Sequence, residues 1–156
     1  MSQNRDEIIR RDPERVRQLS RGISDALSDS GFPVVAVYLH GSWASDNERG
    51  DSDLDLAVLA ERRLESQERL HLVQRVASML MLDCDIDLAD LYSANVVFAA
   101  QVITGGERVF SAGIEADRFE VKTLATYARL NEERHDILRD IFQRGTIYAP
   151  VILGAA

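Results

Sequence analysis

The residues of this 156-residue chain with the clearest chemical potential are carboxylates that follow a glycine–serine pair. Gly41-Ser42 is followed by ten residues and then by Asp53-Leu54-Asp55. Side chains two positions apart on a strand leave the same face, so Asp53 and Asp55 should point in one direction and Leu54 in the other. Two carboxylates held side by side repel each other unless a cation joins them. The pair therefore predicts a metal site.

A third carboxylate would complete a site for two metal ions, and we favour Asp87 for this role. It lies in Asp85-Ile86-Asp87-Leu88, where polar and apolar residues alternate as in a strand. Asp85 shares that alternation and stays the alternative, whereas Asp90 falls on the other face. Ligation by oxygen alone suits Mg²⁺ or Mn²⁺. Two such ions can clamp the attacking and leaving oxygens of a phosphoryl transfer.

The residues at the glycine–serine pair suit a phosphate group. Gly41 lets the chain turn sharply out of a strand and lets a ligand approach the backbone. Ser42 offers a hydroxyl and a backbone N–H at an expected helix start, where anions bind well. We interpret His40 as a packed residue at a strand end, with contact to a nucleotide as the alternative.

The elements that must position these residues can be read from hydrophobic periodicity and capping signals. Asp12-Pro13 predicts the start of a first helix that ends before Gly31. The helix over 66–82 should turn Leu70, Val73, Val76, Ala77 and Leu80 inward. Ser93 is the expected cap of the third helix, which Gly105-Gly106 should end. The expected elements are strands at 34–40, 53–60, 85–91 and 107–110, and helices at 13–30, 66–82, 94–103 and 114–143.

This order predicts an α/β or α+β fold with a small mixed sheet, covered mainly on one face. The length fits one domain over 1–156, with its core at about 34–110 and a long C-terminal helix.

Composition excludes several classes of function. The net charge of −8, from 18 basic and 26 acidic residues, argues against direct nucleic-acid binding, which depends on neutralising phosphates. No apolar stretch is long enough to cross a membrane, and the polar start of the chain does not resemble a secretory signal. Cys84 is the only cysteine, which fits a reducing compartment, so we expect a cytoplasmic protein.

These motifs together resemble a known family. Tyr38-Leu39-His40-Gly41-Ser42, followed by Ser52 through Leu59, resembles the signature of minimal nucleotidyltransferases in the polymerase-β-like superfamily. The run from Asp85 to Leu91 resembles their third-carboxylate strand. The segment from Val96 through Arg118-Phe119-Glu120 to Tyr127 is similar to the C-terminal half of MntA-type antitoxins. The resemblance covers about residues 34–142.

The resemblance implies a polymerase-β-like nucleotidyltransferase fold and a protein adenylyltransferase that transfers AMP from ATP. MntA-type antitoxins modify a tyrosine of a HEPN-family ribonuclease toxin, HepT, which implies such a partner and a hetero-oligomer. Carried over to this chain, Asp53 and Asp55 would bind the metal. Asp87 would be the third carboxylate, and Gly41 and Ser42 would hold the triphosphate.

The chain departs from the family pattern after the glycine–serine pair. Members commonly carry Ala-Arg-Gly there, whereas this chain reads Ala44-Ser45-Asp46. A phosphate-facing cation is thus missing, and Arg49 is a possible substitute. His40 also replaces a common aromatic residue. These changes bear on the affinity for ATP and leave the metal-binding carboxylates unchanged.

Two other functions compete with toxin adenylylation. A small-molecule nucleotidyltransferase would use the same carboxylates, but the chain leaves no second domain for an acceptor pocket. A non-catalytic antitoxin would neutralise its toxin by covering it. The final helix could provide a partner surface or simply pack into the core, through Phe119, Leu124, Tyr127, Leu130, Ile137, Leu138 and Ile141.

Overall fold

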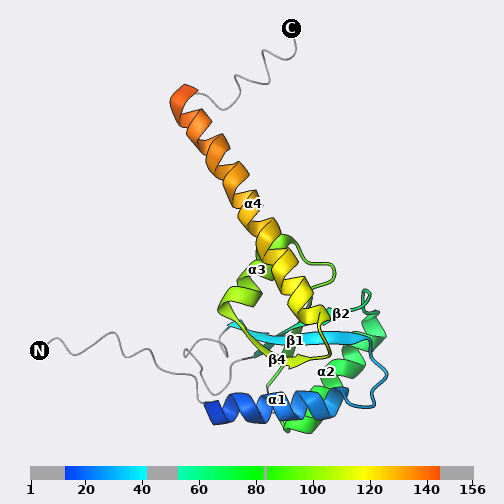
Figure 1. Cartoon of the computed structure of the whole chain (residues 1–156). Coiled ribbons are helices and arrows are strands. Elements are labelled where there is room, and N and C mark those ends of the chain that lie inside the picture. The colour runs from blue at the N-terminus through cyan, green and yellow to red at the C-terminus, as the bar shows by residue number, and fades with distance from the viewer. Residues whose placement is uncertain (1–12, 42–52, 83, 145–156) are drawn as a thin grey trace, which may run out of the picture.

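Four strands form a mixed sheet in the order β3-β2-β1-β4 in the computed structural model, which describes residues 13–41, 53–82 and 84–144 (Figure 1). The strands are β1 (Val34–His40), β2 (Leu54–Ala60), β3 (Ile86–Asp90) and β4 (Glu107–Ser111). β1 runs antiparallel to β2 and β4, whereas β2 and β3 run parallel. The mixed sheet confirms the sequence prediction, and β4 forms one of its edges.

Helices cover both faces of this sheet. α1 (Pro13–Leu27) and α2 (Ser66–Leu80) lie on one face, and α3 (Val96–Gly105) and the start of α4 (Glu115–Arg144) lie on the other (Figure 1). Leu54, Leu56 and Val58 of β2 pack toward α1 and α2. Ala57 and Leu59, which alternate with them, pack toward α3 and α4.

The expectation of a sheet covered mainly on one face is therefore wrong. The physical reason is visible in β1, where the six residues before His40 are all buried. A strand that is apolar on both faces needs cover on both. The continuous run Val-Val-Ala-Val-Tyr-Leu carried that information, because an alternating strand would have left one face polar.

Two local predictions also need correction. Asn95, not Ser93, caps α3, since its side-chain oxygen accepts a hydrogen bond from the Phe98 N–H at 2.9 Å. Ser93 instead donates to Asp90 at 3.2 Å. In α2 the buried residues are Leu72 and the predicted Val76, whereas Leu70 is 55% exposed. Two residues turn a helix by about 200°, so the two leucines face opposite ways.

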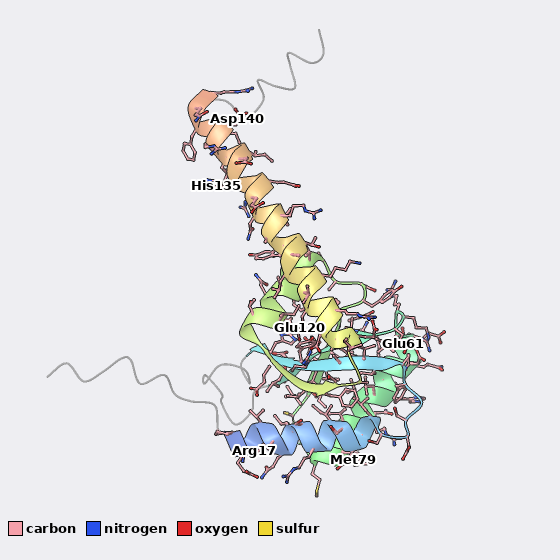
Figure 2. All side chains as sticks on the ribbon, in the orientation of Figure 1. Arg17, Glu61, Met79, Glu120, His135 and Asp140 are labelled. Carbon is pink, nitrogen blue, oxygen red and sulfur yellow. The ribbon has the colours of Figure 1, made fainter. Side chains whose placement is uncertain are left out.

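α4 extends well beyond the rest of the domain. Ala116 and Thr123, near its start, are its buried residues. Figure 2 shows Glu120 where the helix meets the sheet, and His135 and Asp140 along the projecting half. No described helix, including this one, combines the length and apolarity that a membrane span requires.

Candidate active site

The predicted carboxylates lie on neighbouring strands along one edge of the sheet, where β1 ends and β2 and β3 begin. Asp55 of β2 is the register partner of Asp87 on β3 and of His40 on β1. Paired residues of neighbouring strands share a face, so these three side chains form a row on the α3 side. Asp53 directly precedes β2, two residues before Asp55 and therefore toward the same face.

Gly41 lies against the middle of this row. A Cβ atom built at Gly41 would collide with the Asp55 carboxylate, and the backbone there has a φ of +69°. An L side chain would thus meet both a steric and a conformational penalty. The turn out of β1 at Gly41 and the position of Asp55 are consequently tied together, which gives a structural reason for glycine at this position.

The surroundings of Asp55 disfavour the ionised form of its carboxyl. Partial burial raises the pKa of its carboxyl, and the nearby charges of Asp87 and Asp53 raise it further, while His40 opposes the shift. Asp53 and Asp87 are exposed. A divalent cation bound here would relieve the repulsion that Asp87 and Asp53 exert on the ionised form of Asp55.

The donor chemistry fits Mg²⁺ or Mn²⁺, because carboxylate oxygens are the ligands that these ions prefer. Within the described ranges, however, no three His, Cys, Asp or Glu side chains are already gathered closely enough to hold an ion. The strand register places the backbones of Asp55 and Asp87 side by side, so rotation of their side chains can bring the carboxylate oxygens together.

A divalent metal should therefore raise the melting temperature of this protein. At about tenfold above its Kd, a ligand adds about 1.4 kcal/mol to the free energy of unfolding, or about 3–6 °C in a domain of this size. ATP together with Mg²⁺ should raise it further. Calorimetry with Mg²⁺ or Mn²⁺ measures the shift, and the Asp53→Asn, Asp55→Asn double variant should lose it. No shift with either ion in the unaltered protein would contradict the metal site.

The structure also helps to choose between the candidates for the third carboxylate. Asp85 is exposed and precedes β3, and its backbone carbonyl accepts a hydrogen bond from the Leu54 N–H. Asp87 is the register partner of Asp55, which favours it as the third carboxylate. Asp90 alternates to the other face, where it accepts hydrogen bonds from the Tyr92 N–H and the Ser93 hydroxyl. Ser42, the run Ala44-Ser45-Asp46 and Arg49 lie outside the described residues.

A cavity of about 230 Å³ adjoins the row beside β1, and no sequence pattern predicted it. The His40 ring packs edge-on against Phe98 at 5.8 Å between centroids. Gly106 makes the close approach of α3 to β1 possible, because a Cβ there would lie 2.6 Å from the Leu39 carbonyl oxygen. The cavity is lined by His40, Gly41, Phe98, Gln101, Val102, Gly105 and Gly106.

A polar cluster around the buried Tyr38, which was not predicted from the sequence, holds the start of α4. The Tyr38 hydroxyl donates to Glu120 at 2.8 Å, and Arg108 contacts both Glu120 at 3.1 Å and Asp117 at 2.8 Å. Tyr38 is 1% exposed. Its burial, with the bond to Glu120, raises the pKa of its hydroxyl. Tyr38 therefore stays protonated and keeps donating this bond.

Comparison with known proteins identifies the family. A family model described as polymerase beta, nucleotidyltransferase, matches residues 22–115, which include all four strands of the sheet. The chain belongs to this nucleotidyltransferase family. The match confirms the fold that the sequence motifs implied, and it includes the stretch from Gly41 to Asp87 in which the site lies.

Within the nucleotidyltransferase family, this chain has a relative whose sequence similarity exceeds what a shared fold alone would need. The chain is 39% identical over 115 residues to protein adenylyltransferase MntA of Shewanella oneidensis, covering 74% of this chain and 81% of that protein. This nucleotidyltransferase is thus of the MntA type, as the resemblance implied.

Two solved structures similar to this nucleotidyltransferase are toxin–antitoxin complexes. One, with AMP-PNP, has a TM-score of 0.62 and 36% identity, and covers 79% of this chain and 98% of its own. The other contains a tri-AMPylated Shewanella oneidensis HEPN toxin with its MNT antitoxin. It has a TM-score of 0.59 and 34% identity, and covers 81% of this chain and 98% of its own.

Proposed function

We propose that this nucleotidyltransferase is an antitoxin that transfers AMP from ATP to a tyrosine of a HEPN-family toxin. The observation that carries the proposal is the row at the sheet edge. Asp87 is the register partner of Asp55, and Gly41 lies against the Asp55 carboxylate. Asp53 precedes Asp55 by two residues. This arrangement is the one that a metal-assisted phosphoryl transfer needs.

The three carboxylates share the role of binding metal, and Asp87 has a second role as proton acceptor. Asp53, Asp55 and Asp87 would hold Mg²⁺ or Mn²⁺, which supply positive charge to the reacting phosphate when bound. Asp87, at the β3 side of the row, accepts the proton of the tyrosine hydroxyl. The tyrosine oxygen then forms a bond to the α-phosphorus of ATP, the bond from that phosphorus to the β-phosphate oxygen breaks, and pyrophosphate leaves.

The choice of ATP and of a protein acceptor rests on the relatives. One similar structure holds AMP-PNP, and another holds a toxin that carries AMP groups. Gly41 and Ser42 would hold the triphosphate of ATP at the turn after β1. Ser45 and Asp46 take the places of an arginine and a glycine in the family pattern, so we propose weaker ATP binding than in family members that carry both.

We further propose that the projecting half of α4 binds the toxin. The α4 apolar stripe consists of Tyr127, Leu130, Ile137, Leu138 and Ile141, which share one side of the helix at 100° per residue. The same side carries the buried Ala116 and Thr123 nearer the start. The side that packs on the domain thus continues outward as mainly apolar surface, interrupted by Arg134.

The charge pattern of α4 fits a helical, apolar partner surface. Arg139 pairs with Asp136, and Arg144 pairs with Asp140, so these charges are balanced within the helix itself. Ile137 is 61% exposed and Leu138 is 45% exposed. Exposed apolar side chains along one side of a helix are typical of helix-in-groove recognition, and Arg134 is the charged residue within this stripe.

Intact mass spectrometry of a co-expressed HEPN toxin tests the function. We expect a toxin heavier by one or more AMP units on tyrosine, which stays inactive after this antitoxin is removed because the phosphodiester is covalent. Co-expression with the Asp53→Asn variant should give unmodified toxin. Unmodified toxin in both samples, with ribonuclease activity regained on separation, would instead support neutralisation by covering alone.

A further inference from the structure

His40 carries a polar side-chain atom that has no partner in the part of the chain that the structure describes. Its Nε2 is buried and has no hydrogen-bond partner among the described residues. Buried polar atoms in folded proteins are bonded in the large majority of cases, so an exception needs an explanation. The contact that His40 does make, edge-on to Phe98, uses the ring and leaves this nitrogen unused.

The cavity beside this nitrogen has a particular chemistry. Its lining combines the aromatic ring of Phe98, the amide of Gln101 and the backbone at Gly105 and Gly106. None of the described residues that line it is Asp, Glu, Lys or Arg. The triphosphate, which would lie at the turn after Gly41, therefore finds no cationic side chain in the rest of this lining. An uncharged group with a flat ring and polar edges, such as a nucleoside, matches this lining better.

The strand order assigns the two sides of the site to different substrates. In the order β3-β2-β1-β4, Asp87 and His40 lie on opposite flanks of Asp55. If Asp87 takes the proton of the acceptor, the acceptor approaches from the β3 flank. The β1 flank, where the His40 cavity lies, is then left for the donor nucleotide.

We propose that the His40 Nε2 forms a hydrogen bond with the nucleoside part of the donor nucleotide, inside this cavity. The inference rests on the proposed function, since it needs a nucleotide donor. His40, which replaces a common aromatic residue of the family pattern, would then be a specificity-determining residue that touches the substrate.

Two matched variants test this proposal by calorimetric titration with Mg²⁺ and either AMP-PNP or inorganic tripolyphosphate. His40→Phe keeps a ring against Phe98 but removes the nitrogen, so AMP-PNP affinity should fall by about twofold to tenfold, as for one lost hydrogen bond. Tripolyphosphate affinity should stay unchanged. His40→Gln keeps a polar group near the same place and should bind AMP-PNP within about twofold of the unaltered protein.

Other results would overturn the inference. Equal AMP-PNP affinity in the unaltered protein and His40→Phe would overturn this inference and leave the proposed function standing. The same holds if His40→Phe loses affinity equally for AMP-PNP and for tripolyphosphate. Failure of the unaltered protein to bind either probe would overturn the proposed function as well. A measurement that needs no folded variant is the ¹⁵N signal of the His40 ring, which should shift when AMP-PNP replaces tripolyphosphate. An unchanged signal would also overturn the inference.

Discussion

Replacement of Asp53 or Asp55 by asparagine should lower AMP transfer to the toxin by on the order of 10³-fold or more, since charge neutralisation supplies most of the catalysis in this class of reaction. Asparagine keeps the shape of the side chain but removes the negative charge that would hold a divalent cation. Radiolabel transfer from ATP to purified toxin measures the rate. Substantial transfer by Asp55→Asn would mean that the site lies elsewhere.

The stability of these variants separates loss of chemistry from loss of fold. Without metal, Asp55→Asn should melt at the same temperature or a few degrees higher. Partial burial and the charges of Asp87 and Asp53 disfavour the ionised form of Asp55, so removing its charge relieves that repulsion. Asp90→Asn is a matched control, because Asp90 lies two strands from β1 on the opposite face and binds Tyr92 and Ser93. It should keep normal transfer.

Introduction of two charges into the α4 apolar stripe should weaken binding to the toxin by at least about 100-fold, since truncating central apolar contacts typically costs about 2 kcal/mol each. The double variant Ile137→Asp, Leu138→Asp places carboxylates on exposed positions, so the fold of the domain should be unaffected. Titration calorimetry with unmodified toxin measures the affinity. AMP-PNP binding should stay normal, because the carboxylate row lies at the sheet.

The control for this variant lies on the same helix. Gln143 is exposed and lies about 200° around α4 from Ile141, away from the stripe. Gln143→Asp should therefore leave toxin affinity within about threefold, because surface changes outside an interface have small effects. Equal losses in the control and the double variant would indicate a general effect on the helix. Normal affinity in both would place the toxin on another surface.

The sequence predicted the elements that carry the site because their signals are local. An apolar run, a glycine and alternating aspartates define β1, β2 and β3 with errors of one residue at their ends. The same alternation correctly placed Leu54 and Leu56 in the core and Asp90 on the face opposite Asp87. Family membership could also be recognised, because the spacing from Gly41 to Asp55 is itself the motif.

Features that depend on contacts between distant residues were not predictable in this way. The hydrogen bond from Tyr38 to Glu120 joins residues 82 positions apart, and no periodicity marks it. The cavity beside His40 lies where α3 ends against β1 at Gly106. From the sequence, the paired glycines predicted only the end of the helix. The cover of the second sheet face likewise depends on where α3 and α4 pack, which propensity alone does not determine.

Because α4 projects from the domain, a small change of its angle at the start produces a large displacement at its far end. Thr123 is the last buried residue along the helix, and the segment 124–144 beyond it spans about 30 Å at about 1.5 Å per residue. A tilt of about 5° at the start of such a rod moves its far end by about 3 Å. Tyr38, Arg108 and Glu120 hold that starting point against the sheet. The stiffness of this small polar cluster therefore determines how accurately a partner bound near the tip is aimed at Asp55.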